Sequence, residues 1–271
     1  MKLHEIGTLC FEILYSIFYV LFGVYAIVRI LRSKKSFTTT HTTLYTSATM
    51  SRYFFYFLPV HCFARLGEII LRSTFFESFN IETVQLAFSA FPAFTFQIVL
   101  FLYLQVWQLQ EHELSYQTEH KPFLEVRKLH VFLWLLGYTI MIALDFTLIK
   151  YTVENDMYAS YVYMNSNFVI ISFAFFYLGN KMHTAVSLLY GAADAGTFES
   201  HIFRVKWLFG MSCLVRPVYN MSKIWYPILQ TNEFVFNAST FIVEVIPLAA
   251  ALLSMAIVER RMNAMHPALV Q

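Results

Sequence analysis

Charged residues are scarce in this sequence. Asp, Glu, Lys and Arg make up 13% of the 271 residues and hydrophobic residues 58%, whereas an average soluble domain carries roughly 25% charge. So few charges cannot cover the surface of a water-soluble protein of this length. The apolar residues also form long blocks that are not amphipathic, which argues against a soluble all-helical domain. The composition therefore predicts an all-α, polytopic membrane protein.

Cysteine is also rare. Cys10, Cys62 and Cys213 all fall inside apolar blocks, and their spacing matches no metal site. We therefore expect them to be buried thiols that pack like small apolar residues, and we do not expect an exposed structural disulfide.

Catalytic and cofactor motifs are missing as well. The sequence contains no His-Glu-x-x-His motif, no glycine-rich phosphate loop and no Gly-x-Ser-x-Gly elbow. The last apolar block has no Lys for a retinal Schiff base, and His61 and His130 lie at different depths, which disfavours a haem between them. The net charge of +2 gives no sign of nucleic-acid binding. The sequence predicts a protein that is not an enzyme and has no metal or cofactor.

Seven apolar blocks approach or exceed the roughly 20 residues that a helix needs to cross a bilayer. The first contains Glu12 and is too long for the apolar core of a signal peptide, so we expect a retained span. Short polar connections separate the blocks, so residues 1–271 should form a single seven-helix transmembrane domain. The predicted spans cover residues 6–32, 50–71, 83–108, 129–149, 158–182, 205–226 and 234–258.

The placement of Lys and Arg predicts the orientation, because short, positively charged loops stay in the cytosol. One side of the membrane would carry Arg29, Arg32, Lys34, Lys35, Arg52, Lys121, Arg127, Lys128, Lys181, Arg204, Lys206, Arg260 and Arg261. The other side would carry only Lys2, Arg72, Lys150 and Lys223. We therefore expect a lumenal or extracellular N-terminus and a cytosolic C-terminus.

Two charged residues fall near the middle of the last two spans. Counting about 1.5 Å per residue from the span ends places Arg216 and Glu244 at matching depth, on helices joined by a short loop. An unpaired charged acid there would cost roughly 2.5 kcal/mol or more, and a guanidinium fits a carboxylate well. We predict an Arg216–Glu244 pair. It could be a packing clamp or part of a ligand, ion or switch site, and a neutral, protonated Glu244 is the alternative.

A second intramembrane cation, Arg65, has two candidate acidic partners. Glu68 follows it by one helical turn, and Asp145 lies at a similar depth on the fourth span. The predicted intramembrane polar core therefore comprises Arg65, Glu68, Asp145, Arg216 and Glu244.

Three short elements within the spans follow a recognisable pattern. Residues 243–247 read Val-Glu-Val-Ile-Pro, residues 213–216 read Cys-Leu-Val-Arg, and Phe91-Pro92 precedes aromatic and aliphatic residues up to Trp107. In these elements the chain resembles the tobamovirus multiplication protein family, whose seven-pass members are related to lysosomal orphan receptor-like proteins. It departs from the family at Gln108, where an acid would be expected, and in its short tails.

The resemblance implies a non-enzymatic adaptor in a vacuolar, lysosomal or related endomembrane. Members of the family engage small GTPases and, in plants, viral replication proteins. Partner binding would then fall to the cytosolic segments 29–35, 110–128 and 183–204. The basic residues that could contact a cytosolic partner or lipid headgroups are Lys34, Lys35, Lys121, Arg127 and Lys128. A simpler interpretation is that they only orient the protein and attract membrane lipids.

Other functions and locations stay open at this point. A ligand-responsive receptor could use the same polar core as its switch, and an accessory subunit of a larger membrane complex would suit the short loops. A channel or transporter could use the prolines inside the spans, but no inverted repeat is visible. The plasma membrane or another organelle membrane is an alternative location.

Overall fold

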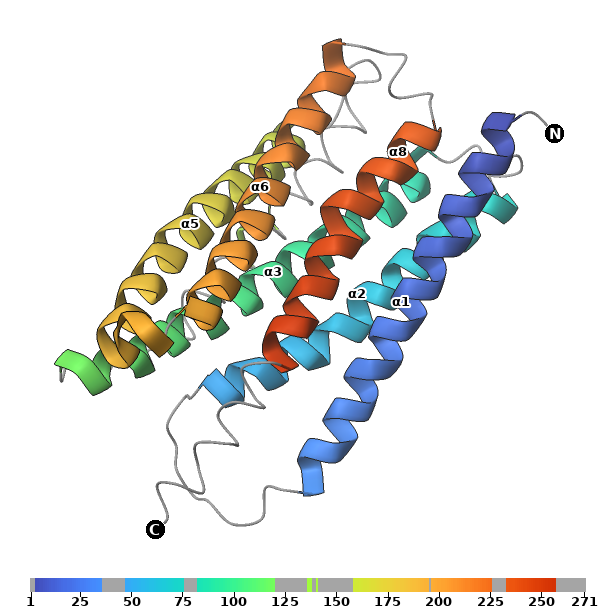
Figure 1. Ribbon diagram of the computed structural model, residues 1–271. Helices are drawn as coiled ribbons and strands as arrows, with labels where there is room; N and C mark the ends of the chain where they lie inside the picture. Colours follow the sequence, from blue (N-terminus) through green and yellow to red (C-terminus); the bar gives the residue numbers. More distant parts are fainter. Residues whose placement is uncertain are drawn as a thin grey trace.

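The chain is helical wherever the structure describes it. The computed structural model describes residues 3–35, 47–75, 82–119, 136–137, 140, 158–194, 196–225 and 233–256, and each of these residues is helical. The all-α class is therefore confirmed for the described residues. The elements (Figure 1) are α1 (Leu3–Lys35), α2 (Ser47–Phe75), α3 (Glu82–Glu119), α5 (Tyr158–Asp194), α6 (Gly196–Trp225), α8 (Glu233–Thr240) and the π-helical turn η1 (Phe241–Val245), after which residues 246–256 are α-helical.

Contacts between side chains define the neighbours and their directions. The pairs α1–α2, α2–α3 and α5–α6 are antiparallel, because residue numbers rise along one helix as they fall along the other. The contacts that show this are Tyr19–His61 and Tyr25–Phe55, His61–Phe96 and Phe54–Tyr103, and Ser172–Gly210 and Asn180–Lys206. The helices α3 and α5 run in the same direction, since Phe96 meets Phe168 and Tyr103 meets Phe175.

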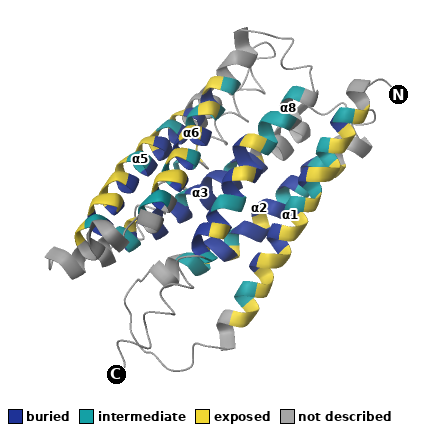
Figure 2. Ribbon diagram, in the orientation of Figure 1, coloured by how far each residue is buried: buried dark blue, intermediate teal, exposed yellow. Residues whose placement is uncertain are grey.

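The core is built around α3. In an apolar 18-residue stretch of Phe91–Glu111, 83% of the residues are buried, against 28% in the corresponding stretch of Ile6–Arg32 of α1. The ring of Tyr103 on α3 contacts Phe54 of α2 and Phe209 of α6, so a single side chain joins three helices. Figure 2 shows the same division, with buried residues on the facing sides of the helices and exposed residues along the outer side of α1.

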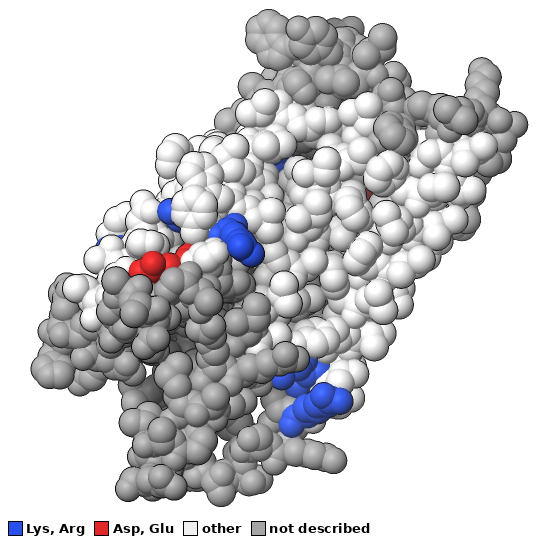
Figure 3. All heavy atoms as spheres, in the orientation of Figure 1, with Lys and Arg blue, Asp and Glu red and all other residues white. Residues whose placement is uncertain are grey.

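Among the described residues, three helices are long and apolar enough to cross a membrane: Ile6–Arg32, Phe91–Glu111 and Ala238–Ala256. They overlap the first, third and seventh predicted spans. The outer face of α1 carries large exposed hydrophobic side chains such as Leu21 and Leu31, as expected of a helix that faces lipid. The face drawn in Figure 3 is mostly uncharged over the described helices, and charged side chains gather toward one end of them.

Two predicted helix boundaries are wrong. α3 continues to Glu119, well past residue 108, because residues 109–119 are rich in Leu, Gln and Glu, which favour a helix in water as well as in lipid. The predicted loop 183–204 is almost wholly helical, since α5 ends at Asp194 and α6 begins at Gly196. The hydroxyl of Ser187 on α5 donates to Glu199 on α6, so the turn between them is held by side chains.

The predicted fourth span lies almost entirely outside the described residues. Of residues 129–149, the structure describes only 136–137 and 140, and these are helical. The number of spans and the orientation therefore stay predictions, because only three of the described helices qualify as membrane spans.

Gly210 allows α5 and α6 to approach each other closely. A Cβ atom there would collide with the ring of Phe176, which packs edge-on against Trp207 with 5.2 Å between centroids. The hydroxyl of Ser172 also donates to the carbonyl of Gly210 at 2.6 Å. A larger side chain would separate the two helices and stretch that hydrogen bond.

We therefore expect Gly210→Leu to destabilise the protein by about 1 to 3 kcal/mol, the usual cost of overpacking. The measurement is the melting temperature, Tm, of the purified protein in detergent. Gly67→Leu is the matched control, because nothing lies within 4 Å of a Cβ atom at Gly67. Equal Tm values for the two variants would contradict the proposed close approach.

Candidate functional site

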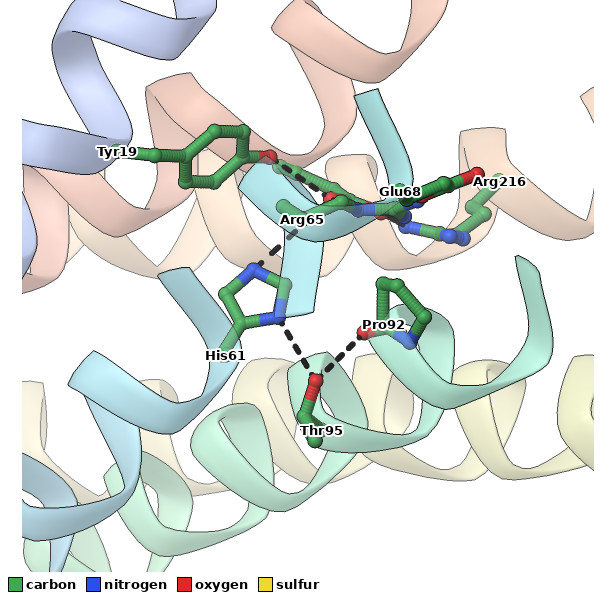
Figure 4. Close-up of polar contacts among 8 residues, drawn as sticks. Tyr19, His61, Arg65, Glu68, Pro92, Thr95 and Arg216 are labelled. Carbon is green, nitrogen blue, oxygen red and sulfur yellow. Dashed lines mark hydrogen bonds and ion pairs between the residues drawn. The ribbon is translucent and has the colours of Figure 1, made fainter. Parts of the chain in front are cut away.

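A cluster of polar side chains lies buried where α1, α2, α6 and η1 meet. We call it the Glu244 network (Figure 4), and its members are Tyr19, His61, Arg65, Glu68, Arg216 and Glu244. Tyr19, His61 and Glu244 have no exposed surface. The network therefore brings together polar groups from both ends of the sequence in an environment without bulk water.

Glu244 is positioned by the π-helical turn η1. The N–H of Ile246 donates to the carbonyl of Phe241, five residues earlier. In an α-helix it would donate to the carbonyl four residues earlier. Pro247 explains this change, because it has no N–H, and its ring would collide with the carbonyl of Val243 in a regular α-helix. The π-turn contains one residue more than an α-helical turn. It therefore changes the directions of the side chains before it relative to those after it. Such π-turns occur frequently at functional sites.

Arg65 binds Glu244 through two of its nitrogens. Its Nε donates to Oε2 of Glu244 at 2.7 Å, and its Nη2 donates to Oε1. Its remaining nitrogen, Nη1, donates to Oε2 of Glu68, one turn away on α2. Arg65 therefore uses every nitrogen of its guanidinium to join two carboxylates, the bidentate geometry that arginine provides and lysine does not.

Arg216, on α6, is the second arginine that binds Glu244. Its Nη1 donates to Oε1 of Glu244, so the predicted contact between these two residues is present. The guanidinium also lies over two aromatic rings, with Cζ 4.9 Å from the ring centroid of Phe168 and 5.3 Å from that of Phe96. These distances are within the range of cation–π attraction. Arg216 is the most exposed charged member of the network, at 14% of its side chain.

Tyr19 and His61 complete the surroundings of Glu244. The hydroxyl of Tyr19 on α1 donates to Oε2 of Glu244 at 2.9 Å. Nε2 of His61 lies 4.0 Å from the same oxygen, too far for a direct hydrogen bond. The other ring nitrogen, Nδ1, lies 3.1 Å from Oγ1 of Thr95 on α3.

The formal charges of the network cancel. Arg65 and Arg216 contribute two positive charges, and Glu68 and Glu244 contribute two negative charges. A buried charge is tolerated when it is paired and hydrogen-bonded, whereas removing one partner leaves an uncompensated charge. What the arrangement supplies chemically is therefore electrostatic attachment of α6 and η1 to α1 and α2. Within the part of the chain that the structure describes, no group of three or more His, Cys, Asp and Glu residues could hold a metal ion.

Sequence reasoning found part of this site and missed part. It found the Arg216–Glu244 and Arg65–Glu68 contacts, but not the two bonds from Arg65 to Glu244, nor Tyr19. A signal for the Arg65 contact was present, because Arg65 lies four residues nearer the end of its predicted span than Glu244 does, an offset of about 6 Å. A long arginine side chain covers that distance.

Several predicted site residues cannot be placed. Asp145, Lys121, Arg127 and Lys128 lie outside the described residues, so the alternative Arg65–Asp145 pair is untested. Lys34 and Lys35 are the last two residues of α1, and only their helical backbone is described.

Comparison with known proteins adds no relative. No protein-family model, no curated protein and no solved structure matches this chain. The resemblance to the tobamovirus multiplication protein family therefore stays a prediction from the sequence.

Proposed function

We propose that this chain is a non-enzymatic, seven-pass endomembrane adaptor whose helix arrangement is held by the Glu244 network. The observation that carries the proposal is the attachment of Glu244 to Arg65, Arg216 and Tyr19, which come from three other helices. An acid surrounded in this way by donors serves to connect helices, and a scaffold requires a stable arrangement of them. The cytosolic segments would then present a constant surface to a partner.

Two observations support seven spans with a cytosolic C-terminus. Because α3 and α5 run in the same direction, residues 120–157 begin and end at opposite ends of the bundle, as a fourth span would require (Figure 1). The described helix ends place Arg29 and Arg32 of α1 beside Arg52 of the antiparallel α2. Gathering of basic residues at one end is the pattern of a cytosolic face.

The network also supports the resemblance to the tobamovirus multiplication protein family. Two of the three elements that carry the resemblance, residues 213–216 and 243–247, meet through Arg216 and Glu244. Two sequence elements that are characteristic of one family are expected to contact each other when they hold its fold together. If the family role carries over, the partner is a small GTPase and the membrane is vacuolar, lysosomal or a related endomembrane.

The adaptor role can be tested by affinity purification in mild detergent followed by mass spectrometry. We expect the wild type to capture a small GTPase and the double variant R127Q/K128Q to capture at least several-fold less, because these residues lie in the cytosolic segment 110–128. The matched control is K150Q/K223Q, which removes two charges from the other side. Loss of capture in both double variants, or in neither, would exclude this surface. Stoichiometric recovery with other membrane proteins would instead indicate an accessory subunit.

A ligand-responsive receptor is the second candidate, and the π-turn favours it. The helix is irregular at η1, directly before Pro247, and the adjacent Arg216 is the least buried charge of the network. A ligand that competes for Arg216 could release α6 from Glu244. A receptor should show ligand-dependent partner binding, whereas an adaptor should bind its partner constitutively.

A further inference from the structure

The buried ring of His61 makes no hydrogen bond to the other members of the Glu244 network. The side chain is fully buried. The ring of Tyr19 packs edge-on against it at 5.7 Å between centroids, and the ring of Phe96 lies at 5.3 Å. Its two nitrogens face different groups, Thr95 on α3 and Glu244 on η1.

Thr95 determines which nitrogen of His61 carries the proton. The hydroxyl of Thr95 donates its single hydrogen to the carbonyl of Pro92 at 3.0 Å, a back-bond to the preceding turn that helical threonines commonly make. Towards His61 that hydroxyl can then only accept, so Nδ1–H of His61 donates to it at 3.1 Å (Figure 4). The neutral ring therefore has its lone pair on Nε2.

This tautomer directs a lone pair towards a carboxylate. Nε2 of His61 has no hydrogen-bond partner and lies 4.0 Å from Oε2 of Glu244. Two acceptors then face each other in a buried site, which is unfavourable. A proton on Nε2 would convert this contact into attraction between opposite charges.

We propose that His61 and Glu244 form a binding site for one exchangeable proton, and that its occupancy decides whether Glu244 keeps Arg216. In the binding step, Nε2 forms an N–H bond with a proton from hydronium, the O–H bond breaks, and water leaves. No other covalent bond changes. The proposal deepens the role of the network as the attachment between helices, since the proton would be the ligand that loosens it.

The groups around His61 indicate which contact gives way. They are Tyr19 from α1, Arg65 and Glu68 from α2, Thr95 from α3, Arg216 from α6 and Glu244 from η1. Protonation changes their formal charge sum from zero to one positive charge. Arg65 is held by three nitrogens on two acids, whereas Arg216 is held to Glu244 by one and is more exposed. Arg216 is therefore the cation that leaves, and the contact between α6 and η1 loosens.

The first test reads the protonation state directly. The full-length protein, labelled with nitrogen-15 histidine and reconstituted in lipid nanodiscs, is measured by nuclear magnetic resonance from about pH 8 down to about pH 3. Comparison with His61→Asn identifies the signal of His61, and the exposed His183 serves as the internal control. We expect a neutral ring protonated at Nδ1 near neutral pH and a doubly protonated ring in acid. Protonation at Nε2 near neutral pH, or one unchanged state throughout, would overturn the proposal.

The second test asks whether that proton is coupled to the helices. Hydrogen exchange of residues 205–219 and 241–250, corrected for intrinsic rates, should become about tenfold faster in acid in the wild type. His61→Asn should abolish the change, while α3 serves as the reference. The same acceleration in His61→Asn would overturn the coupling. Should His61→Asn not fold, Thr95→Val replaces it, because it removes the acceptor of Nδ1–H and should abolish the tautomer preference. The capture of a small GTPase is a separate experiment at neutral pH. Its failure would contradict the adaptor role and leave the two tests of the proton site unchanged.

Discussion

Replacing Glu244 by Gln is expected to lower the Tm of the detergent-solubilised protein more than any other single substitution in the network. The carboxylate accepts hydrogen bonds from Arg65, Arg216 and Tyr19 and is fully buried. Glutamine has nearly the same shape, but it leaves two buried guanidinium groups with Glu68 as their only described anionic partner. Breaking a buried ion pair by removing one partner costs about 3 to 5 kcal/mol.

Glu199→Gln is the control for this experiment. Glu199 also contacts a hydroxyl and a histidine, but its side chain is 25% exposed. Ion pairs that water and salt can screen contribute about 0 to 1 kcal/mol, so its Tm should change little. A Tm of Glu244→Gln equal to that of the wild type would show that the two arginines do not depend on this carboxylate.

Replacing Arg65 by Lys is expected to have the next largest effect, although the charge is conserved. Arg65 joins Glu244 and Glu68 with three nitrogens in one plane. Lysine carries one nitrogen and cannot reproduce that fork. At least one buried carboxylate would lose its charged donor, at a cost of about 1.5 to 3 kcal/mol. The measurement is again the Tm in detergent.

Arg216→Lys provides the matched comparison. Arg216 contacts Glu244 through one nitrogen only, so a lysine could replace that bond and would lose mainly the attraction to the rings of Phe96 and Phe168. We expect a smaller effect, about 0.5 to 2 kcal/mol. If Arg216→Lys lowers Tm as much as Arg65→Lys, the assignment of Arg65 as the central cation is wrong.

The membrane class and two contacts of the site could be predicted because they depend on local composition and spacing. Long apolar blocks identify spans, and Glu68 follows Arg65 by one helical turn. Arg216 and Glu244 could be matched because counting residues from the span ends measures depth. The one neighbour relation that these inferences need, between the helices of Arg216 and Glu244, follows from the short loop that joins them.

The helix ends were predicted less well, because apolar composition ends where the membrane would end but the helix need not. α3 continues to Glu119 through residues that favour helix in water. Near the end of α5 and the start of α6, Ser187 contacts Glu199. That contact involves two residues on different helices and has no local signature.

The sequence by itself determined that the chain is apolar and helical. It also determined that only a few charged residues lie within the predicted spans, and at which depths in the membrane. The tertiary structure alone decided that Arg65 and Tyr19 turn towards Glu244 and that His61 lies between Thr95 and the same carboxylate. The physical reason is that residue counting gives position along a helix axis but not direction around it. Each residue turns that direction by about 100°, and the π-turn before Pro247 changes it again. Only packing against the other helices determines which way each side chain points.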